Sequence, residues 1–146
     1  METLTFKTII AAPREKVWNT MLEKATYQEW TTPFQEGSTF DGTWEKGSEI
    51  QFFSTQQDGG IYALVAESRP YEFISLKHLG EIKNGQKSPW PNTGIGEMFE
   101  NYSFNNIDDG ANTEVVIDVS IPADWKEMFS RTWPLALAKL KEVCER

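Results

Sequence analysis

The chain has 146 residues, 39% of them hydrophobic and 25% charged, which fits one globular domain spanning 1–146 and excludes a disordered polymer. Its net charge of −8 argues against nucleic acid or an anionic membrane as partner, because both are polyanions. With one cysteine and one histidine, the chain cannot form an internal disulfide or a metal site of several thiolates or imidazoles, and we expect no metal and no cofactor.

The first third of the chain predicts one strand followed by two short helices. Apolar and polar residues alternate over residues 4–10, which is typical of a half-buried strand. Pro13 suits the first turn of a helix, because its missing N–H needs no partner there, and an apolar helix face that includes Trp18 follows. Residues 26–29 have the spacing of a capping box, which predicts a second short helix ending near residues 30–33.

The middle of the chain predicts strands in close succession, separated by turn-forming residues. Six strands are expected, over residues 39–44, 48–54, 61–68, 72–79, 96–105 and 112–121. Short connections favour an antiparallel meander. Residues 80–93 are polar and rich in glycine and proline, so we interpret them as a long mobile loop beside a pocket opening. Trp90, between two prolines, would be the apolar anchor of that loop.

The last third carries the strongest pattern. The strand at 112–121 alternates cleanly, and one face carries Val115, Ile117, Val119 and Ile121. A helix is predicted over 124–145, with apolar residues spaced by three and four. An apolar sheet face followed by an apolar helix stripe predicts two packed layers. The bulky helix side chains, Phe129 and Trp133 among them, would face the inside of the sheet, where a hollow could form.

Four segments together carry a family signature. They are IAAPREKVW at 10–18, YQEW at 27–30, ENYSF at 100–104 and WPLALAKLK at 133–141. In this order they resemble the START and birch-pollen-allergen superfamily, in particular the branch named after the activator of the heat-shock-protein ATPase. The resemblance covers essentially the whole chain. It implies an α+β helix-grip fold, in which a curved antiparallel sheet wraps around a long C-terminal helix, with two short helices between the first two strands.

The resemblance also implies a deep cavity between the sheet and the C-terminal helix, but it does not imply one reaction. Members of the superfamily include lipid carriers, hormone receptors, aromatic-polyketide cyclases and chaperone regulators, so the fold is a poor guide to activity. Many relatives in the same branch are stand-alone bacterial proteins.

His78 is the most informative polar residue. It shares strand parity with the apolar Leu76, which places it on the inner face of the sheet. Glu100 shares parity with Tyr102 on the following strand, so we expect the histidine and the carboxylate to meet inside the hollow. Such a pair can polarise a carbonyl, transfer a proton or bind the polar end of a ligand. The alternative is that His78 ends its strand in water and that a bulge reverses Glu100.

We interpret the chain as a protein that holds an apolar or aromatic small molecule in the cavity. The expected ligand-binding residues are Trp18, Phe52, Leu64, Leu76, His78, Glu100, Tyr102, Phe129, Trp133 and Leu137. Plain core packing is the alternative for the tryptophans. No catalytic residue is assigned, although a cyclase or hydrolase using His78 and Glu100 for proton transfer is a rival function. A module that regulates a chaperone ATPase is a second rival, which the resemblance suggests.

The remaining expectations concern location and partners. No apolar run approaches the roughly 20 residues of a membrane span, and no signal peptide is visible, so we expect a cytoplasmic location without membrane insertion. The sequence leaves open whether the chain forms a homodimer. Cys144 lies beside two glutamates that disfavour its thiolate, and we expect it to pack rather than to react.

Overall fold

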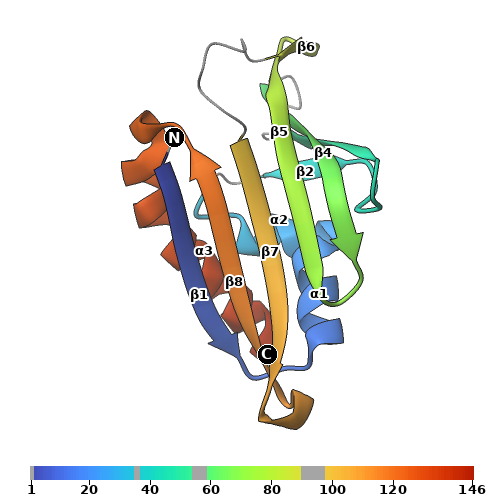
Figure 1. Cartoon of the computed structure of the whole chain (residues 1–146), viewed down its shortest axis with the longest axis vertical. Helices are drawn as coiled ribbons and strands as arrows, with labels where there is room; N and C mark the ends of the chain where they lie inside the picture. The colour runs from blue at the N-terminus through green and yellow to red at the C-terminus, as the bar shows by residue number, and fades with distance from the viewer. Residues whose placement is uncertain (1, 35–36, 54–58, 90–97) are drawn as a thin grey trace.

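The computed structural model describes residues 2–34, 37–53, 59–89 and 98–146, and in this part of the chain three α-helices lie on one face of an antiparallel sheet (Figure 1). The elements are β1 (Glu2–Ile10), α1 (Arg14–Leu22), α2 (Lys24–Trp30), β2 (Thr39–Asp41), β3 (Glu49–Phe53), β4 (Gly59–Arg69), β5 (Phe73–Lys83), β6 (Gln86–Pro89), β7 (Met98–Ile107), η1 (Asp108–Gly110), β8 (Asn112–Ile121), η2 (Ala123–Trp125) and α3 (Lys126–Glu145). None of the described helices combines the length and apolarity needed to span a bilayer.

Every pairing among the described strands is antiparallel, in the order β1-β8-β7-β5-β4-β3-β2. β4 pairs along one edge of β5, while β7 and then β6 pair along the other. The pairing of β1 with β8 places the first strand beside the strand that precedes α3 (Figure 1). The predicted helix-grip architecture, a curved antiparallel sheet with a long C-terminal helix, is thereby confirmed.

The core lies between the inner face of the sheet and the helices. β8 buries every second residue, as its alternation predicts, and its four predicted inner residues are at most 2% exposed. α3 covers this face with its own buried stripe, which includes Phe129, Trp133, Ala136, Leu137 and Leu140. The spacing of three and four therefore gave the correct helix face. Residues 123–125 form a separate 3-10 turn, so α3 begins at Lys126, two residues later than predicted.

The prediction of one long loop over residues 80–93 is wrong for its described part. β5 continues to Lys83, and β6 returns along it after a tight turn at Asn84 and Gly85. Both turn residues have positive φ, 52° and 76°, which is the geometry of a type I′ hairpin turn, for which Asn-Gly is strongly preferred. Trp90 and the end of the predicted loop lie outside the described residues.

The helix starts near the N-terminus also differ from the prediction. The expected capping box at Thr26 is wrong, because α2 begins at Lys24 and its preceding residue, Glu23, makes no side-chain cap. Thr26 Oγ1 instead donates a hydrogen bond to the Glu23 carbonyl, at 3.3 Å. Pro13 lies one residue before the first turn of α1, with an extended backbone. The elements themselves are found where they were expected.

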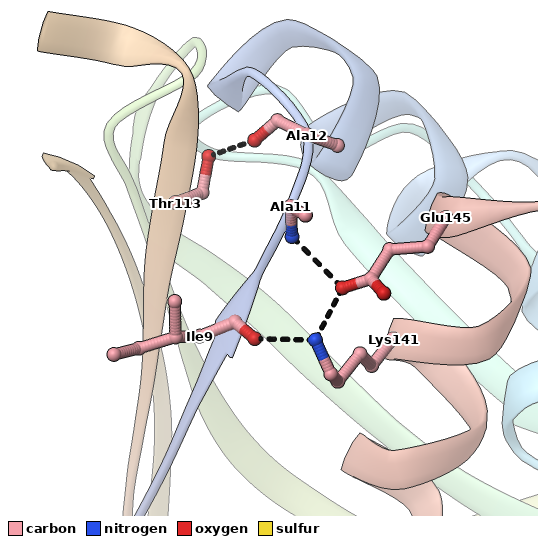
Figure 2. Close-up of polar contacts among 6 residues, drawn as sticks. All are labelled: Ile9, Ala11, Ala12, Thr113, Lys141 and Glu145. Atoms are coloured by element: carbon pink, nitrogen blue, oxygen red, sulfur yellow. Dashed lines mark hydrogen bonds and ion pairs between the residues drawn. The ribbon is translucent and has the colours of Figure 1, made fainter. Parts of the chain in front are cut away.

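Polar contacts fasten the end of α3 to the open edge of the sheet beside β1 (Figure 2). The Lys141 ammonium donates to the Ile9 carbonyl at 3.0 Å, and the Ala11 N–H donates to the Glu145 carboxylate at 2.8 Å. Lys141 and Glu145 also form an ion pair with each other. This set of contacts, called the edge clamp below, occupies backbone groups that a further strand would otherwise use.

Candidate functional site

A pocket of about 610 Å³ lies between the inner face of the sheet and the aromatic side chains of α2 and α3. Its floor comes from β3, β4, β5 and β7. Most of its wall is aromatic and includes Tyr27, Trp30, Phe34, Phe52, Phe129 and Trp133. Such a wall offers a large apolar contact area to a flat or compact ligand.

Trp133 is the centre of the aromatic packing. Its ring lies 5.1 Å from that of Phe34 and 6.0 Å from that of Trp30, between ring centroids. Trp30 is held in turn by a hydrogen bond from its indole N–H to the Met21 carbonyl, at 3.0 Å. The wall is therefore built from α2, the turn after it and α3, and each of its rings is supported by a neighbour.

One side of the pocket is polar. The His78 Nε2 atom lies 3.6 Å from Glu100 Oε2, and the Tyr102 hydroxyl donates to the same oxygen at 2.8 Å. The sheet register explains this contact. Glu100 pairs directly with Leu76, so these two residues share the inner face, and His78, two residues after Leu76 on β5, lies on the same face. The side chains of His78 and Glu100 are only 9% and 15% exposed. We call His78, Glu100 and Tyr102 the polar cluster.

The polar cluster keeps Glu100 ionised. Burial acts to raise the pKa of the carboxyl, but the attraction of His78 and the hydrogen bond from Tyr102 together hold the pKa below its usual range. The pKa of the Tyr102 phenol is raised well above its ordinary value, first by burial and then by the charge of Glu100. At neutral pH the cluster therefore consists of a carboxylate that accepts and a phenol that donates.

Tyr27 is a pocket residue that sequence reasoning missed. Its ring packs edge-on against Trp30 and Phe40, at 5.5 and 5.1 Å, and stacks with Phe52. Burial, and then the nearby charge of Glu100, raise the pKa of its hydroxyl far above the ordinary value. The signal in the sequence was the spacing of Tyr27, Trp30 and Phe34, which places three aromatic side chains on one side of α2 and the turn that follows.

Six of the ten predicted site residues line the pocket: Phe52, His78, Glu100, Tyr102, Phe129 and Trp133. Trp18 does not, because it packs edge-on against Tyr71 and Phe104 at 5.9 and 5.3 Å. Leu76 is fully buried in the core, and Leu137 lies in a separate groove between α3 and β1. The structure thus divides the predicted set into pocket residues and packing residues.

Leu64 lies on the opposite face of the sheet from the pocket. It pairs directly with Glu49 on β3 and Lys77 on β5, whereas its neighbours Ala63 and Val65 are fully buried in the core. The prediction failed because residues 61–65 are all apolar or aromatic, so the run has no alternation from which a face can be chosen.

The described residues contain no group of three or more His, Cys, Asp or Glu side chains that could hold a metal ion. Cys144 is buried, as expected for a packing residue, and burial raises the pKa of its thiol despite a hydrogen bond with Thr20.

The comparisons with known proteins agree with this fold. Residues 11–145 match the model of the Activator of Hsp90 ATPase homolog 1-like protein family. The chain belongs to this family, which confirms the resemblance drawn from its sequence. A search of curated proteins gives no match.

Solved structures with the same fold share little sequence with this chain. The solution structure of the Aha1 dimer from Colwellia psychrerythraea has a TM-score of 0.75 at 19% identity, covering 99% of this chain and 97% of that one. A protein from Chromobacterium violaceum has a TM-score of 0.70 at 18% identity, covering 99% and 97%. DynU16, from the dynemicin biosynthetic locus, has a TM-score of 0.71 at 11% identity, covering 97% of this chain and 46% of that one. At these identities the similarity concerns the fold alone.

Proposed function

We propose that this member of the Activator of Hsp90 ATPase homolog 1-like family binds an apolar or aromatic small molecule in the pocket between its sheet and α3. The observation that carries the proposal is a pocket of about 610 Å³ with an aromatic wall and one polar cluster. This volume lies within the roughly 300–1,000 Å³ that is usual for ligand sites. Apolar contact would supply the affinity, and the polar cluster would orient the ligand.

A filling substitution tests the proposal. Ile61 lines the pocket from β4, and Ile61→Trp should occupy the space that a ligand needs. The matched control is Leu135→Trp, because Leu135 is 57% exposed on the outer side of α3. Phenanthrene binding, followed by quenching of the intrinsic tryptophan fluorescence, should be lost in the first variant and kept in the second. Equal binding by both variants would place phenanthrene elsewhere and contradict the proposal.

Native mass spectrometry of the freshly purified protein provides an independent test. A small molecule that copurifies with the wild type and is missing from Ile61→Trp would identify the class of natural ligand. A molecule that both proteins carry equally would show that the pocket does not hold it.

A second candidate function is an enzyme of the cyclase or hydrolase type. The specific observation in its favour is the 3.6 Å approach of His78 to Glu100 inside the pocket, which is a suitable arrangement for proton transfer. An enzymatic role predicts turnover of a bound substrate that is abolished in both His78→Ala and Glu100→Gln. A binding role predicts altered affinity in these variants without turnover in any protein.

Two partner proposals rest on the comparisons. Because the Colwellia psychrerythraea protein was solved as a dimer, we propose a homodimer for this chain. Light scattering coupled to size-exclusion chromatography would detect it. From the family name we propose an Hsp90-type ATPase as a partner. The ATPase rate of purified Hsp90, measured with and without this protein, tests this interaction. Both tests are independent of the pocket.

A further inference from the structure

The polar cluster leaves one carboxylate oxygen open to the pocket. The hydrogen bond from Tyr102 and the ion pair with His78 both involve Glu100 Oε2. Among the described residues, Glu100 Oε1 accepts no hydrogen bond, and it is not one of the fully buried polar atoms. Because the Glu100 side chain lines the pocket and is 15% exposed, Oε1 is the atom that a ligand can reach.

A second polar atom belongs to the same pocket lining. Tyr27 lines the pocket, and in the described part of the chain its hydroxyl has no hydrogen-bond partner and is not fully buried. It lies near enough to Glu100 for the carboxylate charge to raise the pKa of Tyr27, after burial itself. A phenol at this high pKa stays protonated, so Tyr27 offers a donor to the same pocket into which Glu100 offers an acceptor.

The complement of one open acceptor and one open donor is a hydroxyl group, which donates through its hydrogen and accepts through its oxygen. A carboxylate ligand has no proton to donate to Glu100 and carries the same charge as Glu100. Both the missing hydrogen bond and the repulsion between the charges oppose its binding. An ether accepts from Tyr27 but leaves Glu100 Oε1 without a donor. The aromatic wall remains available to all three ligand types.

We propose that the pocket selects neutral aromatic molecules bearing a hydroxyl group, which donates to Glu100 Oε1 and accepts from the Tyr27 hydroxyl. This inference rests on the proposed function and assigns its ligand class. It separates phenols and related neutral alcohols from fatty-acid-like anions, which an apolar pocket alone would also accept. Glu100 and Tyr27 then act as the residues that determine specificity.

Four probes with one ring system test the proposal: phenanthrene, phenanthren-9-ol, 9-methoxyphenanthrene and phenanthrene-9-carboxylate. Dissociation constants are measured at pH 7 by tryptophan quenching and confirmed by calorimetry. A hydrogen bond to a charged group contributes enough that the hydroxyl probe should bind about tenfold or more tightly than the methoxy probe. The carboxylate should bind most weakly of the four.

Three variants assign the effect to the two residues. In Glu100→Gln the preference for the hydroxyl probe over the methoxy probe should fall severalfold or more, and the carboxylate should bind more tightly than it does to the wild type. In Tyr27→Phe both oxygen-bearing neutral probes should weaken by a similar factor, so their ratio is kept. Phe52→Leu is the control within the same pocket, because it should weaken all four probes equally.

The outcomes are distinguishable from failure of the proposed function. If no probe binds the wild type, the proposed function falls and this inference falls with it. If phenanthrene binds but the hydroxyl and methoxy probes bind equally, or the carboxylate binds best, the ligand class alone is refuted. Circular dichroism checks that each variant is folded. Should Glu100→Gln fail to fold, the wild-type ranking and Tyr27→Phe still decide the question.

Discussion

Truncation of Trp133 provides the most direct test of how the pocket wall is built. Trp133 is 2% exposed and also lines the pocket, so it belongs both to the core and to the site. Its ring contacts those of Phe34, Trp30 and Tyr102, with centroids 5.1, 6.0 and 6.1 Å away. Trp133→Ala removes all of these ring contacts, and alanine still suits the helical backbone of α3.

The expected loss can be worked out from the buried area. A large aromatic side chain buries roughly 150–250 Å², which at about 25 cal/mol/Å² corresponds to roughly 4–6 kcal/mol. Compactness of the unfolded chain reduces this by roughly 10–40%. The vacated volume also joins a pocket that water can enter, so a sealed cavity is not created. We therefore expect Trp133→Ala to lower the free energy of unfolding by about 3 kcal/mol, at the low end of measured Trp-to-Ala losses.

Trp133→Phe separates packing from hydrogen bonding. The Trp133 indole N–H is buried and has no hydrogen-bond partner among the described residues. An unsatisfied buried donor costs about 1–3 kcal/mol, and phenylalanine removes that donor while it keeps an aromatic ring in place. The lost contact area lowers the free energy of unfolding, whereas removal of the unsatisfied donor raises it. The free energy of unfolding should consequently change by only about 1 kcal/mol or less.

Urea unfolding followed by far-UV circular dichroism is the suitable assay, because the substitutions themselves alter tryptophan fluorescence. An unchanged dependence on urea concentration would show that stability alone has changed. Leu135→Ala on the exposed side of α3 is the control and should stay within about 0.5 kcal/mol of the wild type. A loss under about 1 kcal/mol for Trp133→Ala would refute the packing described here. Equal losses for the alanine and phenylalanine variants would show that the indole N–H has a partner.

Three further predictions concern charge and backbone. His78→Gln should raise the pKa of Glu100, because burial would then act against less opposing charge. The wild-type carboxylate contributes stability above its unfolded pKa and loses it as pH falls through the lower folded pKa. The stability gap between wild type and variant should therefore narrow as pH falls below about 4 in urea unfolding. Gly60→Ala should cost about 1–3 kcal/mol, because a Cβ there would clash with the backbone of β3, whereas at Gly59 it meets only ordinary contact, so Gly59→Ala should be tolerated. Glu145→Gln should speed hydrogen exchange at the backbone amide that follows β1, and unchanged exchange would contradict the edge clamp.

The parts of the fold that the sequence predicted are those where one face alone is buried. On β8 the alternation is uninterrupted, so the strand and its buried face both follow from one pattern. The same parity located the polar cluster, because His78 and Glu100 lie on paired strands without an irregularity between Ile74 and His78 on that side. Parity therefore predicts contacts reliably where both strands alternate and pair in regular register.

The sequence-based errors have two physical causes. At Leu64 the run of apolar residues removed the alternation, so the face was chosen without a signal. At β6 the strand is short, polar and exposed, which hides it from any hydrophobic pattern. The hairpin was nevertheless visible through Asn84 and Gly85, since that dipeptide is a strong turn signal. Tyr27 was missed for a different reason, because α2 begins at Lys24 and not at the predicted capping box, so Tyr27 lies within the helix and not at its start.

The pairing of β1 with β8 has a consequence for the order in which the chain can fold. β1 is synthesised well before β8, its partner strand, and the contact of Thr113 with Ala12 spans 101 residues. At roughly 5–20 residues per second, β1 waits for roughly 5–20 s during translation before that partner exists. The edge clamp joins Ala11 to Glu145 across 134 residues and closes later still. Contacts this distant in the chain slow folding, so the β1–β8 edge of the sheet waits for β8, and the edge clamp waits for the last turn of α3.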